Sequence, residues 1–382
     1  MPFPTVGIIG AGQLARMSAA PAAALGVRLR LLSATPEDCA TQVVPDVHVG
    51  SPADVAAVLR FTEGCDVVTF EHEHVPAATL QALEESGVPV RPGAAALRHA
   101  QDKIVMRERL SAAGLPCPRW TAVRSVADIA GFAEEVGWPV VLKAARGGYD
   151  GRGVWLVDAA EEAGPVLADL AAKGVRCLAE ERVEFAGELA ALVARSPHGQ
   201  AAAYPVVETV QRDGICREVY APAPGLPADA AAEAQDVALR IAGLLGVVGI
   251  LAVEMFRTRE GRVLVNELAM RPHNSGHWTI DGAVTSQFEQ HLRAVLDLPL
   301  GAPTATAPLS VMANILGGAY PDMYAPYRHV FARDPKLHAH LYGKEVRAGR
   351  KVGHVTVVGD DLTDLQDRAR HAAAYFMGEI TE

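Results

Sequence analysis

The sequence lacks three features that would place the protein at a membrane, outside the cell or on nucleic acid. The longest uncharged apolar run, residues 241–253, falls short of the roughly 20 residues that a membrane-spanning helix needs. The first residues, MPFPTVGIIG, lack the basic stretch of a signal peptide. The formal net charge of −10 lacks the basic excess of a nucleic-acid-binding protein. These absences predict a cytoplasmic protein that binds neither membranes nor nucleic acid.

Cysteine is also scarce, with five residues at positions 39, 65, 117, 177 and 216. Their spacing matches neither a zinc knuckle nor a redox pair, so reduced thiols are expected. Half of the 382 residues are apolar, which is enough for two or three domains with buried cores.

The first hundred residues alternate predicted strands with predicted helices, which is typical of a doubly wound parallel sheet. We expect strands at residues 5–10, 27–32, 65–71 and 88–93, and helices at 11–26 and 75–87. Gly10 and Gly12 follow the first strand with a spacing that resembles a dinucleotide-binding fingerprint. The acidic residue of that fingerprint is replaced by Ser33. An NAD-linked oxidoreductase stays open as an alternative on this glycine turn alone.

Changes in composition divide the rest of the chain. A helix is predicted over residues 97–114, and strands, glycine loops and helices then alternate up to a proline-rich stretch at 296–310. Short strands at 337–343 and 351–359 and a helix at 361–378 close the chain. We therefore expect three domains, covering residues 1–98, 99–300 and 301–382.

Residues 146–153, RGGYDGRG, follow an apolar strand that ends near Lys143. The backbone amides of a glycine-rich loop can face a phosphate, and arginines add positive charge. Glycine is equally at home in a plain hairpin turn. This stretch alone leaves both interpretations open.

Two glutamates are predicted to face each other on a later hairpin. Residues 250–270 read as two strands, and a two-residue turn would pair Arg259 with Arg262. The same register pairs Glu254 with Glu267 on one face. Like charges in this position favour a cation between them, and carboxylate oxygens suit Mg²⁺ that also binds phosphates. Asn266 adds a further oxygen beside Glu267.

The order of these parts is that of ATP-grasp enzymes: a strand lysine, a glycine loop, an acidic strand end at residues 178–185 and paired carboxylates. Four motifs, GGYDGRG, GICREVYAPA, RPHNSGHWT and GKEVRAGRKVGHVT, narrow the match. From GAGQLARM to RKVGH the chain resembles the 5-(carboxyamino)imidazole ribonucleotide synthetase family, the ATPase subunit of phosphoribosylaminoimidazole carboxylase. The resemblance implies an α/β ATP-grasp fold with an N-terminal doubly wound parallel-sheet domain and a small C-terminal β-rich domain.

The resemblance also implies an activity. The family is an ATP-dependent carbon–nitrogen ligase of de novo purine biosynthesis, which carboxylates 5-aminoimidazole ribonucleotide with bicarbonate through carboxyphosphate and releases ADP and phosphate. ATP, Mg²⁺ and bicarbonate are the implied cofactors and co-substrate, and a cytoplasmic homodimer is the implied assembly.

Site residues follow from the same resemblance, position by position. Metal ligands are expected at Glu254 and Glu267. ATP is expected to contact Arg98, Lys143, Gly148, Tyr149, Asp150, Gly151, Arg152, Gly153, Val154, Glu180, Glu181, Arg182, Val183, Glu188, Gln211, Asn266 and Glu267. The bicarbonate-derived intermediate and the aminoimidazole are expected among the catalytic residues Tyr149, Arg152, Arg271, His273 and Asn274.

The ribonucleotide is expected to contact Glu71 and Glu73, which match an acidic pair of the family. A basic cluster near the C-terminus, Lys344, Arg350 and Lys351, is expected to hold its 5′-phosphate by charge-assisted hydrogen bonds. Arg347 is a weaker candidate for this phosphate contact, because it is expected to face solvent.

Other functions stay open beside this one. Another ATP-grasp ligase, such as a formate-dependent glycinamide ribonucleotide transformylase or a biotin carboxylase, would share the ATP and magnesium groups but not RPHNSGH. A non-catalytic nucleotide-binding protein would leave the paired glutamates without a task. Structural zinc at the alternating histidines, His72 with His74 and His338 with His340, is disfavoured because no third ligand is predictable.

Overall fold

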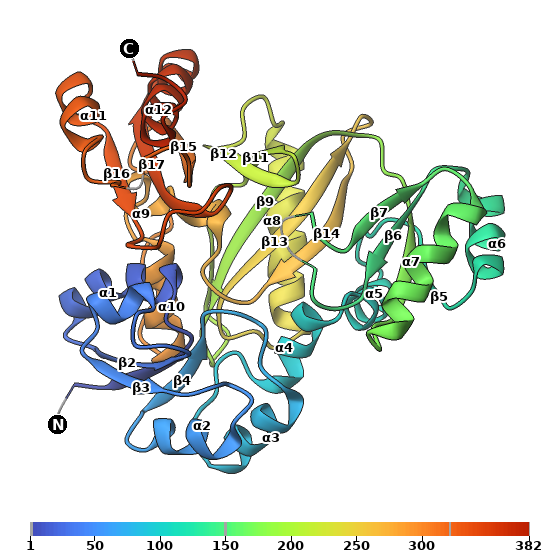
Figure 1. Ribbon diagram of the computed structural model, residues 1–382, viewed down its shortest axis with the longest axis horizontal. Coiled ribbons are helices and arrows are strands. Elements are labelled where there is room, and N and C mark those ends of the chain that lie inside the picture. Colours follow the sequence, from blue (N-terminus) through green and yellow to red (C-terminus); the bar gives the residue numbers. More distant parts are fainter. Residues whose placement is uncertain (1–2, 149–150, 321, 382) are drawn as a thin grey trace.

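The computed structural model describes residues 3–148, 151–320 and 322–381, and Figure 1 shows its arrangement. The N-terminal sheet is parallel, with the strand order β3-β2-β1-β4. Its strands are β1 (Thr5–Ile9), β2 (Arg28–Ser33), β3 (Asp46–Val49) and β4 (Val67–Phe70). The surrounding helices are α1 (Gln13–Leu25), the 3-10 helix η1 (Cys39–Gln42), α2 (Val55–Thr62) and α3 (Ala77–Glu85). The predicted parallel sheet is confirmed.

The strand predicted at 88–93 is not one. This segment contributes a single parallel bridge, Val68 to Val90, at the edge of β4. Pro89 and Pro92 have no amide hydrogen, so the segment cannot continue a hydrogen-bonded ladder.

The helix predicted over 97–114 is two helices, α4 (Ala94–Gln101) and α5 (Lys103–Ala112). The break lies at Asp102, whose backbone is extended with φ −139° and ψ 110°. Its Oδ1 accepts hydrogen bonds from the amides of Ile104 at 3.1 Å and Val105 at 3.2 Å, so it caps α5. An aspartate in the middle of a helix-like stretch was the signal for this boundary.

A small antiparallel sheet lies at one end of the molecule, beside two helices (Figure 1). Its strand order is β5-β8-β6-β7, from β5 (Trp120–Val123), β6 (Val140–Ala144), β7 (Val154–Val157) and β8 (Cys177–Glu181). The helices are α6 (Val126–Val136) and α7 (Ala160–Ala172). Lys143 pairs with Val154, so the glycine-rich stretch connects the two strands of a hairpin.

The large sheet follows the order β14-β13-β9-β11-β12-β15-β17-β16, with β10 beside β9. Its central strands are β9 (Phe185–Arg195), β10 (Ala201–Ala203), β11 (Val207–Arg212), β12 (Ile215–Ala221), β13 (Gly249–Thr258) and β14 (Val263–Ala269). The C-terminal strands β15 (Leu309–Leu316), β16 (His338–Leu341) and β17 (Lys351–Gly359) extend the same sheet through β12. The C-terminal region therefore shares its sheet with the middle of the chain.

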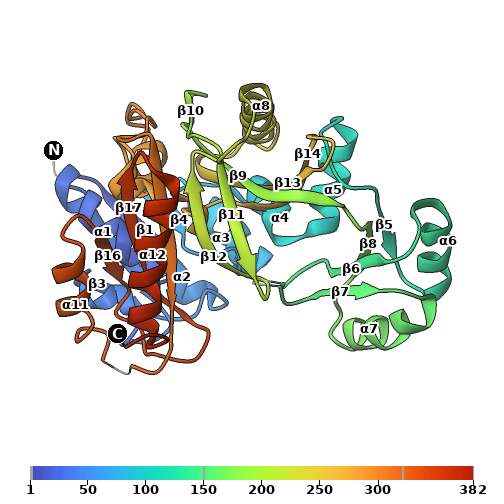
Figure 2. The same cartoon turned by 90° about the horizontal axis from the view of Figure 1, so that it is seen from above.

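Helices cover this sheet from several sides (Figure 2). They are α8 (Ala228–Leu244), the 3-10 helix η2 (Asn274–Gly276), α9 (Thr279–Gly282), α10 (Gln287–Val295), α11 (Tyr327–Arg333) and α12 (Leu362–Met377). Ile241 of α8 packs in one apolar cluster with Val253 of β13 and Phe61 of the N-terminal unit. Each such buried side chain contributes roughly 1.5–3 kcal/mol. The shared cluster fixes the N-terminal sheet against the large sheet.

Among the residues that the structure describes, none of the helices has the length and apolar character needed to cross a bilayer.

Replacing the buried cap is expected to destabilise the protein more than replacing an exposed one. Asp102→Ala removes a cap that is 1% exposed and should lower the free energy of unfolding by about 1–2 kcal/mol. Asp54→Ala removes the exposed cap of α2, which accepts from Ala57 N, and should cost about 0.5–1 kcal/mol. Denaturant unfolding followed by circular dichroism measures both, and equal losses would contradict a special role for the Asp102 cap.

Candidate active site

A cavity of about 2090 Å³ lies where the N-terminal sheet, the small sheet and the large sheet meet. Most of the expected site residues line it: Glu71, Glu73, Lys143, Gly148, Gly151, Arg152, Val154, Glu180, Glu181, Arg182, Val183, Glu188, Gln211, Glu254, Asn266, Glu267, Arg271, His273, Asn274, Lys344, Arg350 and Lys351. Tyr149 and Asp150 lie outside the described residues. Gly153, at φ +76°, closes the hairpin next to the cavity without lining it.

Arg98 is the expected phosphate contact that the structure does not bring into the cavity. It is exposed on α4 and does not line the cavity. Lys103, in the first turn of α5, lines the cavity instead, with Nζ 3.0 Å from Glu267 Oε1. The helix break at Asp102 separates the two residues, because it turns α5 to a new direction. A reading of 97–114 as one helix could not show this.

Glu254 and Glu267 face each other across β13 and β14, as predicted. The predicted turn is wrong, however: Thr258 N donates to Arg262 O at 2.9 Å, so the loop contains three residues, 259–261. A β-bulge next to these glutamates restores their register, because Val265 pairs with Met255 and Glu267 with Glu254. Asn266 is the bulged residue, which has no partner in the register of β13.

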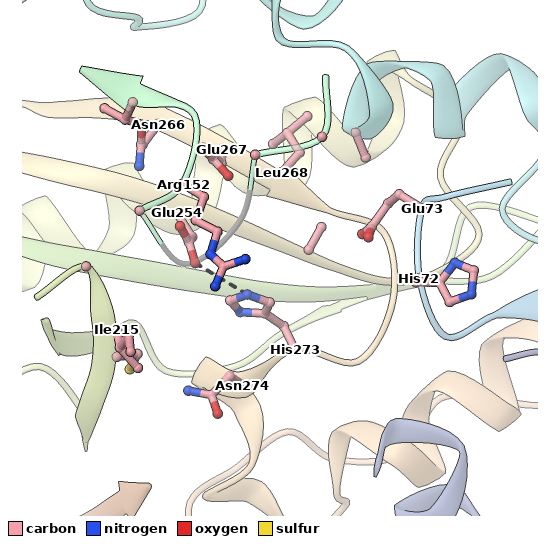
Figure 3. Close-up of a pocket in the computed structure, with 18 of the residues that line it drawn as sticks. His72, Glu73, Arg152, Ile215, Glu254, Asn266, Glu267, Leu268, His273 and Asn274 are labelled. Carbon is pink, nitrogen blue, oxygen red and sulfur yellow. Dashed lines mark ion pairs between the residues drawn. The ribbon is translucent and has the colours of Figure 1, made fainter. Parts of the chain in front are cut away.

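The bulge also changes which side chains reach the cavity. In a regular strand Asn266 and Glu267 would point to opposite faces. The extra residue lets both line the cavity, and Figure 3 shows them with Glu254 around a common space. The amide oxygen of Asn266 and the carboxylate oxygens of Glu254 and Glu267 are suited to a hard cation.

The two carboxylates face each other in the cavity, and Lys103 pairs with Glu267. Burial, together with the nearby charges of Glu267 and Glu188, raises the pKa of Glu254 to about 7. Within the described ranges, no group of three or more His, Cys, Asp or Glu side chains is arranged to hold a metal ion. A cation between these two carboxylates would take its remaining ligands from a bound phosphate and water.

His273 borders the same pocket as an uncharged ring. Burial, with the charges of Arg271 and Lys351, lowers its pKa to about 3. Its Nδ1 accepts from the amide of Ser275 at 3.4 Å, so the proton lies on Nε2, which is 3.3 Å from Glu254 Oε1. In Figure 3 Arg152 extends from the hairpin toward this pair.

A buried ionic network forms part of the cavity wall. Glu180 of β8 accepts from Arg107 Nε at 2.7 Å and pairs with Lys143 Nζ at 2.7 Å. Lys143 Nζ also donates to Asn266 Oδ1 at 2.9 Å, and Arg107 Nη2 donates to Asn266 O at 2.9 Å. No motif in the sequence indicated Arg107, whose side chain is 1% exposed. Both oxygens of Glu180 are engaged with cations of the chain.

Glu71, expected at the ribonucleotide, caps helix α1. Its carboxylate accepts from the amides of Gly12 and of Leu14, the latter at 3.0 Å. Burial raises the pKa of Glu71, and these amides oppose the shift. A dinucleotide would place its pyrophosphate at this helix N-terminus. Because a carboxylate of the chain fills the position, the glycine turn does not support NAD binding.

Glu73 is differently placed. Its Oε2 accepts from Arg271 Nε at 3.0 Å, while its buried Oε1 makes no hydrogen bond within the described part of the chain. Glu73 lines the cavity, and Figure 3 shows it on the side of the N-terminal sheet. An unsatisfied acceptor at this depth favours a ligand that donates a hydrogen bond.

The basic cluster of the C-terminal region faces two parts of the cavity. Lys344 Nζ donates to Gln13 Oε1 of α1, and burial lowers the pKa of Lys344. The charge of Lys351 acts on Lys344 and also on Glu254 and His273, where it favours a lower pKa. Arg350 donates to Glu345 O at 3.3 Å. Arg347 is exposed and pairs with Glu345, and it also lines the cavity.

Comparison with known proteins agrees with this architecture. The ATP-grasp domain model matches residues 108–288, the ribonucleotide synthetase preATP-grasp domain model 3–101, and the phosphoribosylaminoimidazole carboxylase C-terminal domain model 310–368. An N5-carboxyaminoimidazole ribonucleotide synthase of Mycobacterium bovis is 55% identical over 373 residues, covering 97% of this chain and 87% of the relative.

Solved structures match over the whole length. An ADP complex of an N5-carboxyaminoimidazole ribonucleotide synthetase superposes with a TM-score of 0.89 at 35% identity, covering 100% of this chain and 99% of that chain. The N5-carboxyaminoimidazole synthase of Aspergillus clavatus, in complex with ADP and 5-aminoimidazole ribonucleotide, gives a TM-score of 0.89 at 33% identity, covering 99% and 100%.

The sheets, the paired glutamates and the domain match define an ATP-grasp enzyme, and the predicted fold class is confirmed. The chain belongs to the N5-carboxyaminoimidazole ribonucleotide synthase family, as its motifs indicated.

The buried network should make stability depend on pH. The cations of Arg107 and Lys143 outweigh burial and lower the pKa of Glu180 to about 2, against about 4.3 in an unfolded chain. The contribution is therefore complete above about pH 4.3 and is lost as the pH falls toward 2. The shift corresponds to about 3 kcal/mol at neutral pH.

Glu180→Gln should lower the free energy of unfolding at pH 7 and flatten its dependence on pH between about 5 and 2.5. The control is Glu135→Gln, which removes an exposed ion pair with Arg119 and should leave the slope unchanged. Denaturant titrations at several pH values give both slopes. A slope for Glu180→Gln equal to that of the wild type would show that the network contributes no such term.

Proposed function

We propose that this cavity binds ATP, bicarbonate and 5-aminoimidazole ribonucleotide, and that the chain joins them in the reaction of its family. The chain is an ATP-dependent carbon–nitrogen ligase that forms N5-carboxyaminoimidazole ribonucleotide with release of ADP and phosphate. The observation that carries the assignment of the site is the facing pair Glu254 and Glu267, with Lys143 and Asn266 in the same cavity.

ATP is placed between the small sheet and the large sheet. Lys143 and Lys103 supply cations on two sides of Asn266 and Glu267, where the phosphates would lie. Arg152 and the glycines of the hairpin cover them. Glu181, Arg182 and Val183 line the cavity after β8, where the family resemblance places the base and ribose. Arg98 has no part in this site.

The residues present fit Mg²⁺. Glu254, Glu267 and the amide oxygen of Asn266 are hard oxygen donors, and the carboxylates of Glu254 and Glu267 face each other. When bound, the ion would neutralise charge on the phosphates of ATP.

Bicarbonate attack on the γ-phosphate forms a new oxygen–phosphorus bond, breaks the bond to ADP and gives carboxyphosphate. Carboxyphosphate then releases phosphate and carbon dioxide, and the exocyclic amine of the ribonucleotide adds to that carbon with loss of a proton. The chain contributes positioning and charge: Arg271 and Arg152 attract the anions, and neutral His273 donates from Nε2. Asn274 and Tyr149 complete the set that the resemblance places around the intermediate.

The ribonucleotide is placed between the N-terminal sheet and the basic cluster. The buried Oε1 of Glu73, which has no partner among the described residues, can accept a hydrogen bond from the amine of the ribonucleotide. Lys344, Arg350 and Lys351 are proposed to hold the 5′-phosphate dianion. Glu71 acts indirectly, by capping the helix whose N-terminus borders this part of the cavity.

The chain's organisation completes the proposal. Domain limits of 1–98, 99–300 and 301–382 are close to the matched ranges 3–101, 108–288 and 310–368. A homodimer in the cytoplasm is the assembly that the family resemblance implies, and light scattering after size-exclusion chromatography tests it.

One assay tests the function. ADP release is measured with ATP, Mg²⁺ and bicarbonate, with and without 5-aminoimidazole ribonucleotide, and the carboxylated product is measured in parallel. ADP and product that appear together only when every substrate is present support the proposal. ADP release that requires formate and a glycinamide ribonucleotide instead would assign the chain to another ATP-grasp reaction.

Glu267→Gln should lower turnover by about a hundredfold or more, because it removes a carboxylate ligand while the fold survives. Turnover is measured by ADP release over a range of Mg²⁺ concentrations. The control is Glu260→Gln in the exposed turn of the same hairpin, which should behave as the wild type. Near-normal turnover of Glu267→Gln at saturating Mg²⁺ would refute the metal role.

Lys344→Ala and Arg350→Ala should each raise the KM for the ribonucleotide and leave the KM for ATP nearly unchanged. Losing one charge-assisted contact costs about 1.5–3 kcal/mol, or roughly ten- to a hundredfold in apparent affinity. Arg347 also lines the cavity, but its guanidinium already pairs with Glu345, so Arg347→Ala should leave both KM values near the wild-type level. Weakened ATP binding in the first two variants would place the phosphate site elsewhere.

A further inference from the structure

The segment that carries His273 and Asn274 runs from the end of β14 into η2 and is packed without spare room. Gly276 shows this most clearly, because a Cβ atom there would lie 2.5 Å from Gln287 Oε1 and would also meet the side chain of Leu192. The segment is held between β9 and the first residue of α10.

Both polar atoms of the Gln287 side-chain amide make hydrogen bonds to this segment. Its Oε1 accepts from the amide of His273 at 2.8 Å, and its Nε2 donates to the carbonyl of His273 at 2.8 Å. Nε2 is also 3.0 Å from Nδ1 of His277. Gln287 is 0% exposed and does not line the cavity, so it cannot touch a substrate.

We propose that Gln287 is a positioning residue for the carboxylation: it fixes the backbone of His273, and through His277 it connects this segment to the C-terminal strands. This inference rests on the proposed function, because it assigns His273 to the reacting groups. The bidentate contact holds both backbone groups of His273, which sets the direction from which its ring reaches Glu254.

The hydrogen bonds also fix the protonation of His277. The orientation of Gln287 is determined by the backbone of His273, so Nε2 must donate to His277 Nδ1 and the proton of that ring lies on its Nε2. The ring of His277 is 5.0 Å from that of His354 on β17. His354 Nδ1 is 2.8 Å from the hydroxyl of Tyr342, two residues before Lys344.

A buried contact path therefore joins the two halves of the substrate site. It begins at His273, beside the paired glutamates, and ends at the loop that carries Lys344. Lys344 Nζ lies over the Tyr342 ring, 5.6 Å from its centre, in a cation–π contact. The residues along this path are enclosed in protein, so their role is to hold its two ends in position.

The same helix offers a matched control. Gln290 of α10 is also 0% exposed, and it holds the backbone of Gly301 in the same bidentate way, with distances of 2.7 and 2.8 Å. Gly301 does not line the cavity. Gln287→Met and Gln290→Met therefore each lose a buried bidentate contact to a backbone, and Gln287→Met also loses the contact with His277. Only Gln287→Met releases a segment of the site.

The experiment compares full-length wild type, Gln287→Met and Gln290→Met by thermal unfolding and by steady-state kinetics. Both variants should unfold at similarly lowered temperatures. Gln287→Met should lose about ten- to a hundredfold in kcat relative to Gln290→Met, with KM for ATP nearly unchanged. It should also release more ADP for each carboxylated product, because a misplaced His273 leaves the intermediate to water.

Equal kcat and equal coupling in the two variants would overturn the inference. A wild-type enzyme that forms no carboxylated ribonucleotide would refute the proposed function instead, so the two failures differ. If Gln287→Met does not fold, nitrogen-15 histidine NMR of the wild type at pH 7, with His277→Asn for assignment, decides. A neutral His277 protonated on Nε2 supports the clamp, and a ring protonated on Nδ1 overturns it.

Discussion

The site depends on the contact between Glu180 and the two cations that flank it. The small sheet and the large sheet share no strand pairing among the described residues, so something else must set their separation. Glu180 and Lys143 belong to the small sheet, and Arg107 connects Glu180 to the carbonyl of Asn266 on the large sheet. Burying these charges has a desolvation penalty of several kcal/mol for each ion. The network repays it with directional bonds, which an apolar contact of the same volume would not supply.

The β-bulge at Asn266 is the second constraint, and it relies on the first. A bulge leaves one residue outside the ladder, with a carbonyl that needs another partner. Arg107 provides that partner, while Lys143 binds the side-chain oxygen of the same residue. Two cations thus hold Asn266 beside Glu267, and the facing carboxylates of Glu254 and Glu267 are kept close despite their repulsion.

The sequence allowed the prediction of whatever depends on local periodicity or on a motif. The parallel N-terminal sheet and the pairing of Glu254 with Glu267 are of this kind, because alternation along a strand determines the face. The bulge was out of reach, since one extra residue in the turn and one in the strand cancel in the register. Arg107 and Gln287 were also out of reach, because their partners are distant in sequence. Asp102 offered a readable cap signal, which would have divided the helix predicted over 97–114.

The large sheet explains how distant segments keep fixed distances across the cavity. Strand pairing is continuous from β14 and β13, which carry the glutamates, through β9, β11, β12 and β15 to β17, which begins at Lys351. Each pairing fixes neighbouring strands at about 4.8 Å. Lys351, at the start of β17, lines the same cavity as Glu254 and His273, and its charge opposes the rise in the pKa of Glu254 and helps to lower that of His273. The paired glutamates lie on this sheet, whereas the glycine-rich hairpin belongs to the small sheet, which shares no strand pairing with it among the described residues.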